Sequence, residues 1–120
     1  MTTAKEVIDG AFNVLALTQD GEELENDEAQ KQLIQLNSML HAWELEGIKL
    51  NHSDLELNET LPFPDNHIRP IIDNFAVEIS PNYGKQLNPV VALRAEYGHS
   101  MLVSFYANSD PNENTDFYYY

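Results

Sequence analysis

The sequence predicts an all-α fold: a small four-helix bundle with an extended or hairpin loop between its second and third helices, and an extended C-terminal tail. Large apolar residues recur at alternating spacings of three and four in four segments, which is typical of amphipathic helices. Glycine and proline residues separate these segments. With 120 residues, the chain is long enough for one domain with a modest core. We expect a helical domain at residues 1–107 and a docking tail at residues 108–120.

The first helix is expected over residues 3–17, where Ala4, Val7, Ile8 and later apolar residues share one face. Thr2 or Thr3 would cap this helix, with Glu6 placed for a capping box. A Gln-Asp-Gly sequence at residues 19–21 then ends it.

A linker at residues 20–28 carries six acidic side chains and leads into the second helix. Carboxylates are favoured there by the positive end of the helix dipole, and Asn26 or Asp27 is the expected cap. A solvated helix start explains these residues, and a cation site is the alternative interpretation.

The second helix is expected to end near Glu46, after near twenty residues. Its inner face carries Ala29, Leu33, Leu36, Leu40 and Trp43, whose spacing is that of one amphipathic stripe. Gln32 and its polar neighbours would face outward. Gly47 follows at a position where helices commonly end in a left-handed turn.

Residues 48–64 are less regular. Ile48 and Leu50, then Leu55 and Leu57, alternate with polar residues as they would in a strand. The expectation is a short hairpin or an extended arm, and the prolines at positions 62 and 64 favour an exposed segment over a central strand.

The third and fourth helices are expected over residues 66–80 and 89–107. Pro70 fits the third helix only if that helix begins near His67, so that the proline falls in the first turn. Pro81 ends it. Asn88 would cap the fourth helix, with Pro89 at its first position.

The fourth helix is apolar on two sides. Val90, Leu93, Tyr97 and Met101 form one stripe, and a second stripe consists of Val91, Leu102 and Phe105. A helix of this kind is either central to a bundle or shared with a neighbouring subunit.

The tail, residues 108–120, begins with nine residues that lack any large apolar side chain. It then presents Phe117, Tyr118, Tyr119 and Tyr120 in succession. Clustered aromatic residues dominate binding hot spots. We therefore expect a tether that docks on another chain through Asp116 and these four aromatic residues, and a frayed terminus is the alternative.

Composition excludes several classes of protein. The net charge of −14, from 20 acidic and 6 basic residues, argues against a protein that grips nucleic acid through its phosphates. The acidity is interpreted as a solvated surface, as a surface that faces DNA without binding it, or as a DNA mimic. The absence of cysteine excludes disulfides. No apolar run reaches membrane-spanning length, and no signal peptide is recognisable, so a soluble, unexported protein is expected.

No catalytic motif is recognisable. The four histidines lack metal-ligand spacing, and the chain contains neither a glycine-rich phosphate loop nor a nucleophile elbow. Residues 110–116 are spaced like the first ligands of a calcium loop, but Thr115 occupies the place that needs glycine. We expect no enzyme activity, no cofactor and no metal site.

Three segments together resemble a known family. They are QLNSMLHAWELEGI at residues 35–48, FAVEISPNYG at residues 75–84 and LRAEYGHSML at residues 93–102. Their order and spacing are similar to those of the head-to-tail adaptors of tailed bacteriophages, in particular the tail accessory factors, or packaged-DNA stabilisation proteins, of short-tailed phages. The resemblance covers residues 4–105, whereas the loop at 49–64 matches poorly and the C-terminal extension is short.

The resemblance implies a virion protein of the head–tail connector, assembled in the host cytoplasm. It implies a ring of twelve copies that binds the portal protein, extends the DNA channel without binding DNA specifically, and presents a platform for the next tail component, a nozzle or hub. By position, residues 108–120 would reach along the portal. No membrane is involved.

Two sets of residues acquire expected roles in such a ring. The second stripe of the fourth helix, Val91, Leu102 and Phe105, would pack between subunits. The acidic surface or channel wall would be formed by Glu22, Glu23, Glu25, Asp27 and Glu28. The main alternative is an acidic inhibitor that mimics DNA, which would use the acidic linker and have no need of the aromatic tail.

Overall fold

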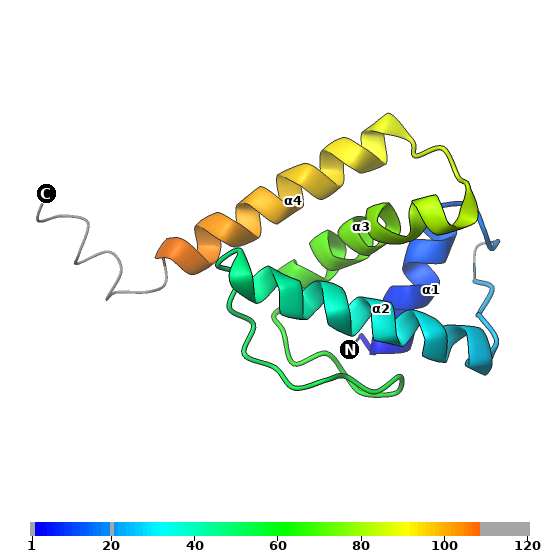
Figure 1. The fold of residues 1–120 in the computed structure, drawn as a ribbon, viewed down its shortest axis with the longest axis horizontal. Coiled ribbons are helices and arrows are strands. Elements are labelled where there is room, and N and C mark those ends of the chain that lie inside the picture. The colour runs from blue at the N-terminus through cyan, green and yellow to red at the C-terminus, as the bar shows by residue number, and fades with distance from the viewer. Residues whose placement is uncertain (1, 20, 109–120) are drawn as a thin grey trace, which may run out of the picture.

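The computed structural model describes residues 2–19 and 21–108 as a helical bundle. Its elements are α1 (Ala4–Val14), α2 (Asn26–Leu45), the short 3₁₀ helix η1 (Asp65–His67), α3 (Ile68–Ile79), a second 3₁₀ helix η2 (Ser80–Tyr83) and α4 (Pro89–Asn108). Figure 1 shows how the four α-helices are arranged. Because α3 packs against α1 on one side and α4 on the other, α4 lies at the edge of the bundle. The predicted all-α four-helix fold is confirmed.

The helix ends follow local sequence signals. At α1, the Glu6 N–H donates to Thr3 Oγ1 at 3.2 Å, and the Thr3 N–H donates to Glu6 Oε1 at 3.0 Å, so the predicted capping box is present. At α4, the Val90 N–H donates to Asn88 Oδ1 at 2.8 Å, as expected of a cap. Pro70 lies in the first turn of α3, where its missing N–H has no partner to lose.

Two helix ends differ from expectation. Helix α1 ends at Val14 rather than near position 17, because Ala16 adopts a left-handed conformation with φ of +58°. Helix α2 begins at Asn26, and Glu25 is its N-cap without a side-chain cap hydrogen bond. Asn26 and Asp27 are therefore first-turn residues, and the prediction that one of them is the N-cap is wrong. The favourable dipole of the helix start still applies to the carboxylates there.

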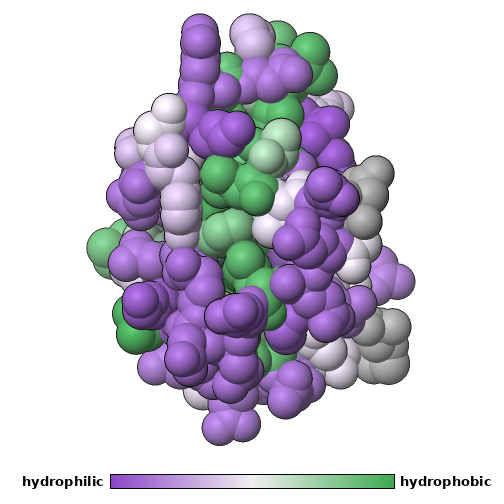
Figure 2. Space-filling view, turned by 90° about the vertical axis from the view of Figure 1, so that its right-hand side faces the viewer, coloured by the Kyte–Doolittle hydropathy of each residue, from purple (hydrophilic) through white to green (hydrophobic). Residues whose placement is uncertain are grey.

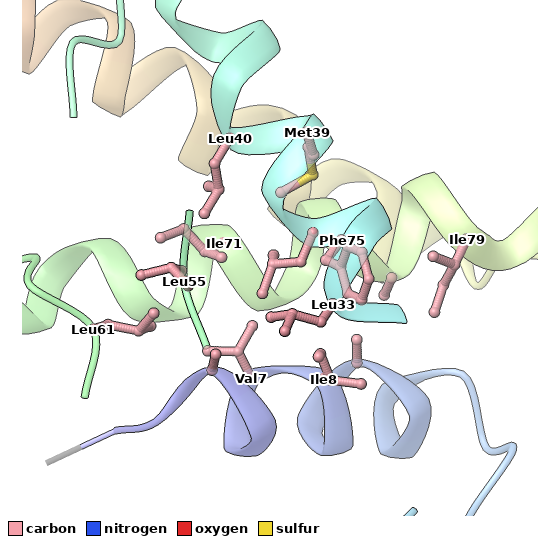
Figure 3. Close-up of a cluster of buried hydrophobic side chains, with 14 of the residues drawn as sticks. Val7, Ile8, Leu33, Met39, Leu40, Leu55, Leu61, Ile71, Phe75 and Ile79 are labelled. Carbon is pink, nitrogen blue, oxygen red and sulfur yellow. The ribbon is translucent and has the colours of Figure 1, made fainter. Parts of the chain in front are cut away.

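The core lies where α1, α2, α3 and the loop after α2 converge (Figure 3). Phe75 of α3, Leu40 of α2 and Ile8 of α1 are fully buried in it. Every predicted inner-face residue of α2 is buried as well. Full burial of such side chains stabilises a fold by about 1.5–3 kcal/mol each, so the amphipathic stripes account for the bundle.

The segment 46–64 is part of this core. Among the described residues its only ladder-type pairing is an isolated bridge between Thr3 and Thr60, so the segment is an irregular loop and the hairpin is not observed. It is not the exposed segment that its prolines suggested. Six of its apolar side chains are buried: Ile48, Leu50, Leu55, Leu57, Leu61 and Phe63.

Hydrogen bonds hold this loop in place. The Ala4 N–H donates to the Glu59 carbonyl at 3.1 Å and the Lys5 N–H to the Leu57 carbonyl at 2.9 Å. These are first-turn donors of α1 that no helix carbonyl can accept. On the α2 side, Asn37 accepts from the Leu55 N–H at 2.9 Å and donates to the Leu55 carbonyl at 3.1 Å. The loop therefore caps one helix and is clamped by another.

Candidate docking surface

One face of α4 is apolar and exposed. Leu93 and Tyr97 are 68% and 69% exposed, and the face continues through Val90 and Met101 to Phe105, which is 45% exposed. We call these five residues the α4 face. In the described part of the chain, only Ile34 and Leu45 of α2 are other large, exposed hydrophobic residues. An apolar row of this length on a helix surface marks an interaction site more often than a solvated one.

A neighbouring stripe of α4 is the one that packs against α3. It consists of Val91, Ala95, Gly98 and Leu102, which recur at helical spacing and are all buried. A Cβ atom added at Gly98 would lie 3.0 Å from Pro70 Cβ, which is closer than an ordinary contact. Asn74 Nδ2 also bridges the helices, donating to the carbonyls of Pro70 at 2.8 Å and Ala95 at 2.9 Å. The two small residues thus allow the helices to approach closely.

This packing corrects the predicted subunit interface. Val91 and Leu102 are only 7% and 4% exposed within a single protomer, so neither is available to a neighbour. Phe105 alone of the three candidates reaches the surface, at the edge of the α4 face. The sequence did contain an indication of which stripe packs inside the protomer, namely the small residues Ala95 and Gly98. Small residues mark the side of a helix where another backbone approaches.

A groove runs between α3 and α4 beside the α4 face. Its volume is about 220 Å³. The walls combine apolar and cationic side chains, among them Arg69, Pro70, Arg94, Tyr97, Met101 and Phe105. Apolar walls with a few charged groups are typical of binding grooves, and both arginines of the chain lie here.

A buried ion pair forms the floor of this groove. The Asp73 carboxylate is 1% exposed. Arg94 donates to it twice, from Nε to Oδ2 at 2.8 Å and from Nη2 to Oδ1 at 3.0 Å. Arg69 Nε lies 3.4 Å from the same Oδ2. Because a buried carboxylate is costly unless it is paired in good geometry, this bidentate contact orients α4 on α3.

His67 is buried at the end of the groove. Its Nε2 lies 2.7 Å from the Tyr106 hydroxyl and its Nδ1 lies 2.6 Å from Asn66 Oδ1. The ring also packs edge-on against Phe105, with centroids 5.4 Å apart. Burial lowers the pKa of His67 below its usual value. A neutral imidazole satisfies both contacts, by donating to the asparagine oxygen and accepting from the tyrosine hydroxyl.

The pKa of His67 predicts acid sensitivity. The unfolded chain takes up the proton first, near the ordinary pKa of about 6.5, so the stability that depends on neutral His67 is complete above that pH. It is lost as the pH falls from there towards the lower folded-state pKa, with a slope of at most about 1.4 kcal/mol per pH unit. Urea unfolding between pH 7.5 and 5, compared for the native protein and His67→Gln, measures this.

The comparison with His67→Gln removes the contributions of other groups. His52, whose pKa is also lowered, chiefly by burial, is present in both proteins, as are all other ionisable side chains. The difference between the two free energies of unfolding should therefore shrink on acidification. Parallel pH dependences for the two proteins would show that His67 is not coupled to folding.

The acidic candidates lie at the end of the molecule away from the C-terminal end of α4. Glu22, Glu23, Glu25 and Asp27 are exposed, and Glu28 is partly buried. The connection between α1 and α2 carries most of them (Figure 1), and Figure 2 views this end, where hydrophilic surface flanks an apolar strip. Asp9 anchors the loop by accepting from the Leu24 N–H at 3.2 Å.

Within residues 2–19 and 21–108, few of these acidic side chains have a basic partner. Lys5 Nζ lies 3.9 Å from Glu23 Oε2, although its closer partner is Asp9 at 2.9 Å. Gln32 Nε2 donates to Glu28 Oε2 at 3.3 Å. These contacts are those of a solvated acidic surface.

The docking residues predicted in the tail, Asp116 to Tyr120, lie outside the described residues.

The remaining histidines form ring contacts. His41 Nε2 lies 2.6 Å from Asp54 Oδ1, and the His41 ring stacks on His52 with centroids 4.9 Å apart. Across residues 2–19 and 21–108, no three His, Asp or Glu side chains are grouped so that they would hold a metal ion. Within the same residues, no helix combines the length and hydrophobicity needed to cross a membrane.

Comparison of the chain with protein-family models and with curated proteins found no match. The α4 face and the adjoining groove are therefore interpreted from their own geometry and chemistry.

Proposed function

We propose that this protein is a head-to-tail adaptor of a short-tailed bacteriophage. It binds the portal protein as a ring of identical copies, extends the DNA channel, and joins the capsid vertex to the next tail component, a nozzle or hub. The observation that carries the proposal is the exposed α4 face, an apolar surface on an otherwise acidic protein. The three sequence segments that resemble the adaptor family support it, and the virion neck is the corresponding location.

A ring requires two different surfaces on each subunit, because head-to-tail contacts join unlike patches. The α4 face supplies one of them. Ile34 and Leu45 supply the second, since they are the large exposed hydrophobic residues of α2 and are separated by about three helical turns. Phe105 contributes at the edge of the first surface, whereas Val91 and Leu102 hold α4 on its own protomer.

The acidic end has a role in the same ring. Glu22, Glu23, Glu25, Asp27 and Glu28 form a strongly negative surface with few basic neighbours. If this surface lines the channel, it repels the DNA backbone and allows DNA to pass without binding. The alternative use of the same acids, as a DNA mimic in a basic cleft, requires neither the α4 face nor the tail.

The aromatic tail supplies the test of portal binding. Replacing Phe117, Tyr118, Tyr119 and Tyr120 with serine is expected to weaken binding to the cognate portal protein by about 30-fold or more, because aromatic anchors carry most of the energy of an interface. Biolayer interferometry with immobilised portal measures the affinity, and electron microscopy of the mixture shows whether rings form.

A matched control is available in the polar part of the tail. Asn112→Ser with Asn114→Ser changes the same segment without removing aromatic surface, and should bind as the native protein does. Native binding by the variant that lacks the four aromatic side chains would refute docking through the tail. Failure of the native protein to bind any portal, together with inhibition of a nucleic-acid enzyme, would favour the DNA mimic.

A further inference from the structure

We propose that in the free protein the aromatic end of the tail, residues 117–120, occupies the groove between α3 and α4 of its own protomer. The groove lies beside the α4 face, and this face is the surface that the proposed ring would use. The proposal concerns the isolated chain, so it stands or falls independently of the adaptor function.

The chemistry of the groove fits aromatic side chains. Pro70, Tyr97, Met101 and Phe105 provide an apolar wall. A methionine sulfur is a favourable neighbour for aromatic rings. Arg69, whose side chain is 57% exposed, provides a guanidinium on which a tyrosine ring can stack. A volume of about 220 Å³ leaves room for one or two of the four rings, with the others lying along the α4 face.

Charge favours the same placement. Residues 109–120 carry the acids Asp110, Glu113 and Asp116 and no basic residue. An acidic segment is repelled by most of a protein with a net charge of −14. Both arginines of the chain lie in the groove. Although each has Asp73 as a partner, their side chains remain partly exposed and attract further carboxylates.

The length of the tail suits a return along its own helix. From the end of α4 at Asn108 back to Arg94 is fourteen residues, or about 21 Å at 1.5 Å per residue. The eight residues 109–116 extend to about 26 Å, which allows a reversal and places positions 117–120 beside Arg94 to Met101. The sequence Asp110-Pro111-Asn112 is typical of such chain reversals.

The tail is expected to dock in the groove of its own protomer and not in that of a second copy. A tail joined by a short linker is present near its own groove at an effective concentration of about millimolar. A second copy must approach against the repulsion between two strongly negative molecules. Occupied in this way, the groove and part of the neighbouring α4 face are covered in the isolated protein.

The absence of cysteine allows a disulfide test in the full chain. Met101→Cys with Tyr119→Cys places one thiol at the groove and one in the tail. Glu96→Cys with Tyr119→Cys is the control, because Glu96 is exposed on α4 only five residues away but on another side of the helix. Both proteins are oxidised at low micromolar concentration, and intramolecular disulfide formation is followed by mass spectrometry without reductant.

We expect the 101–119 disulfide to form within one molecule at least about tenfold faster than the 96–119 disulfide, as the local concentration of a docked tail implies. Equal rates for the two pairs would overturn the proposal. Disulfide-linked dimers as the main product of the 101–119 pair would overturn it as well, by identifying a second copy as the occupant. If Met101→Cys fails to fold, Tyr97→Cys replaces it, because that side chain is 69% exposed.

Discussion

Replacing Leu93 and Tyr97 together with glutamate should abolish ring assembly while the monomer remains folded. The two side chains are 68% and 69% exposed, so the substitutions add charge to surface that is already in water and should change the free energy of unfolding by less than about 0.5 kcal/mol each. In an assembled ring the same positions would be buried between copies, where unpaired carboxylates are costly. We expect association on the portal to weaken by about 100-fold or more.

Sedimentation velocity on mixtures with portal protein measures the assembly, and thermal unfolding of the isolated variant verifies its fold. A charge-matched control is Asn82→Asp with Gln86→Glu, which adds two carboxylates at exposed polar positions and should assemble normally. Normal rings from the Leu93 and Tyr97 variant would rule out the α4 face as a subunit interface.

Substitutions on the other side of α4 should behave differently. Val91→Glu or Leu102→Glu would bury a carboxylate between α4 and the rest of the protomer, and should unfold the chain rather than block assembly. Phe105 is a poor choice for this comparison, because it is exposed at the α4 face and also packs against His67. Comparing substitutions in the two stripes of α4 therefore distinguishes effects on ring assembly from effects on the stability of the protomer.

Replacing Arg94 with alanine is expected to lower the free energy of unfolding by about 3 kcal/mol. The substitution removes a bidentate partner from the buried Asp73 carboxylate and, among the described residues, leaves that charge with Arg69 Nε at 3.4 Å. Breaking a buried ion pair on one side costs about 3–5 kcal/mol. The partial exposure of Arg94 and the remaining arginine place the expected value at the lower end.

Urea unfolding monitored by circular dichroism provides the measurement. Arg69→Ala is the matched control, since Arg69 contacts the same oxygen at a longer distance and is more exposed, so its loss should cost less than about 1 kcal/mol. Equal costs for the two arginine variants would contradict the assignment of Arg94 as the principal partner.

A double substitution distinguishes an unpaired charge from lost packing. Asp73→Leu with Arg94→Met removes both members of the pair and fills the space with apolar atoms, which is often neutral or stabilising. The double variant should therefore be more stable than Arg94→Ala alone. If it is equally destabilised, the arginine acts mainly through the packing of its aliphatic stem.

The sequence alone determined the local structure of this protein. The capping box of Thr3 and Glu6, the Asn88 cap and the first-turn position of Pro70 all follow from neighbours within a few residues. The buried stripe of α2 follows from helical periodicity. These features depend on interactions inside one helix, and those interactions are encoded in contiguous residues.

Contacts between distant segments were decided only by the tertiary structure. Gln32 was expected to face solvent, yet it is buried and its Nε2 donates to the Tyr83 hydroxyl at 2.7 Å, across fifty-one positions of the chain. The loop at 48–64 was expected to be exposed, yet it supplies core side chains and caps α1. Neither partner is visible in local sequence, because nothing near Gln32 indicates that a tyrosine from η2 will approach it.

Which of the two stripes of α4 is buried was also decided by contacts between distant segments. Periodicity identifies both stripes but gives no information about which of them another helix covers. That choice depends on how closely two backbones approach. Gly98 permits the approach to Pro70, and the Ala95 carbonyl accepts from Asn74 of α3 on the same side. The sequence therefore determined that α4 would form and would be apolar on two sides, whereas packing against α3 decided which side was left exposed for a partner.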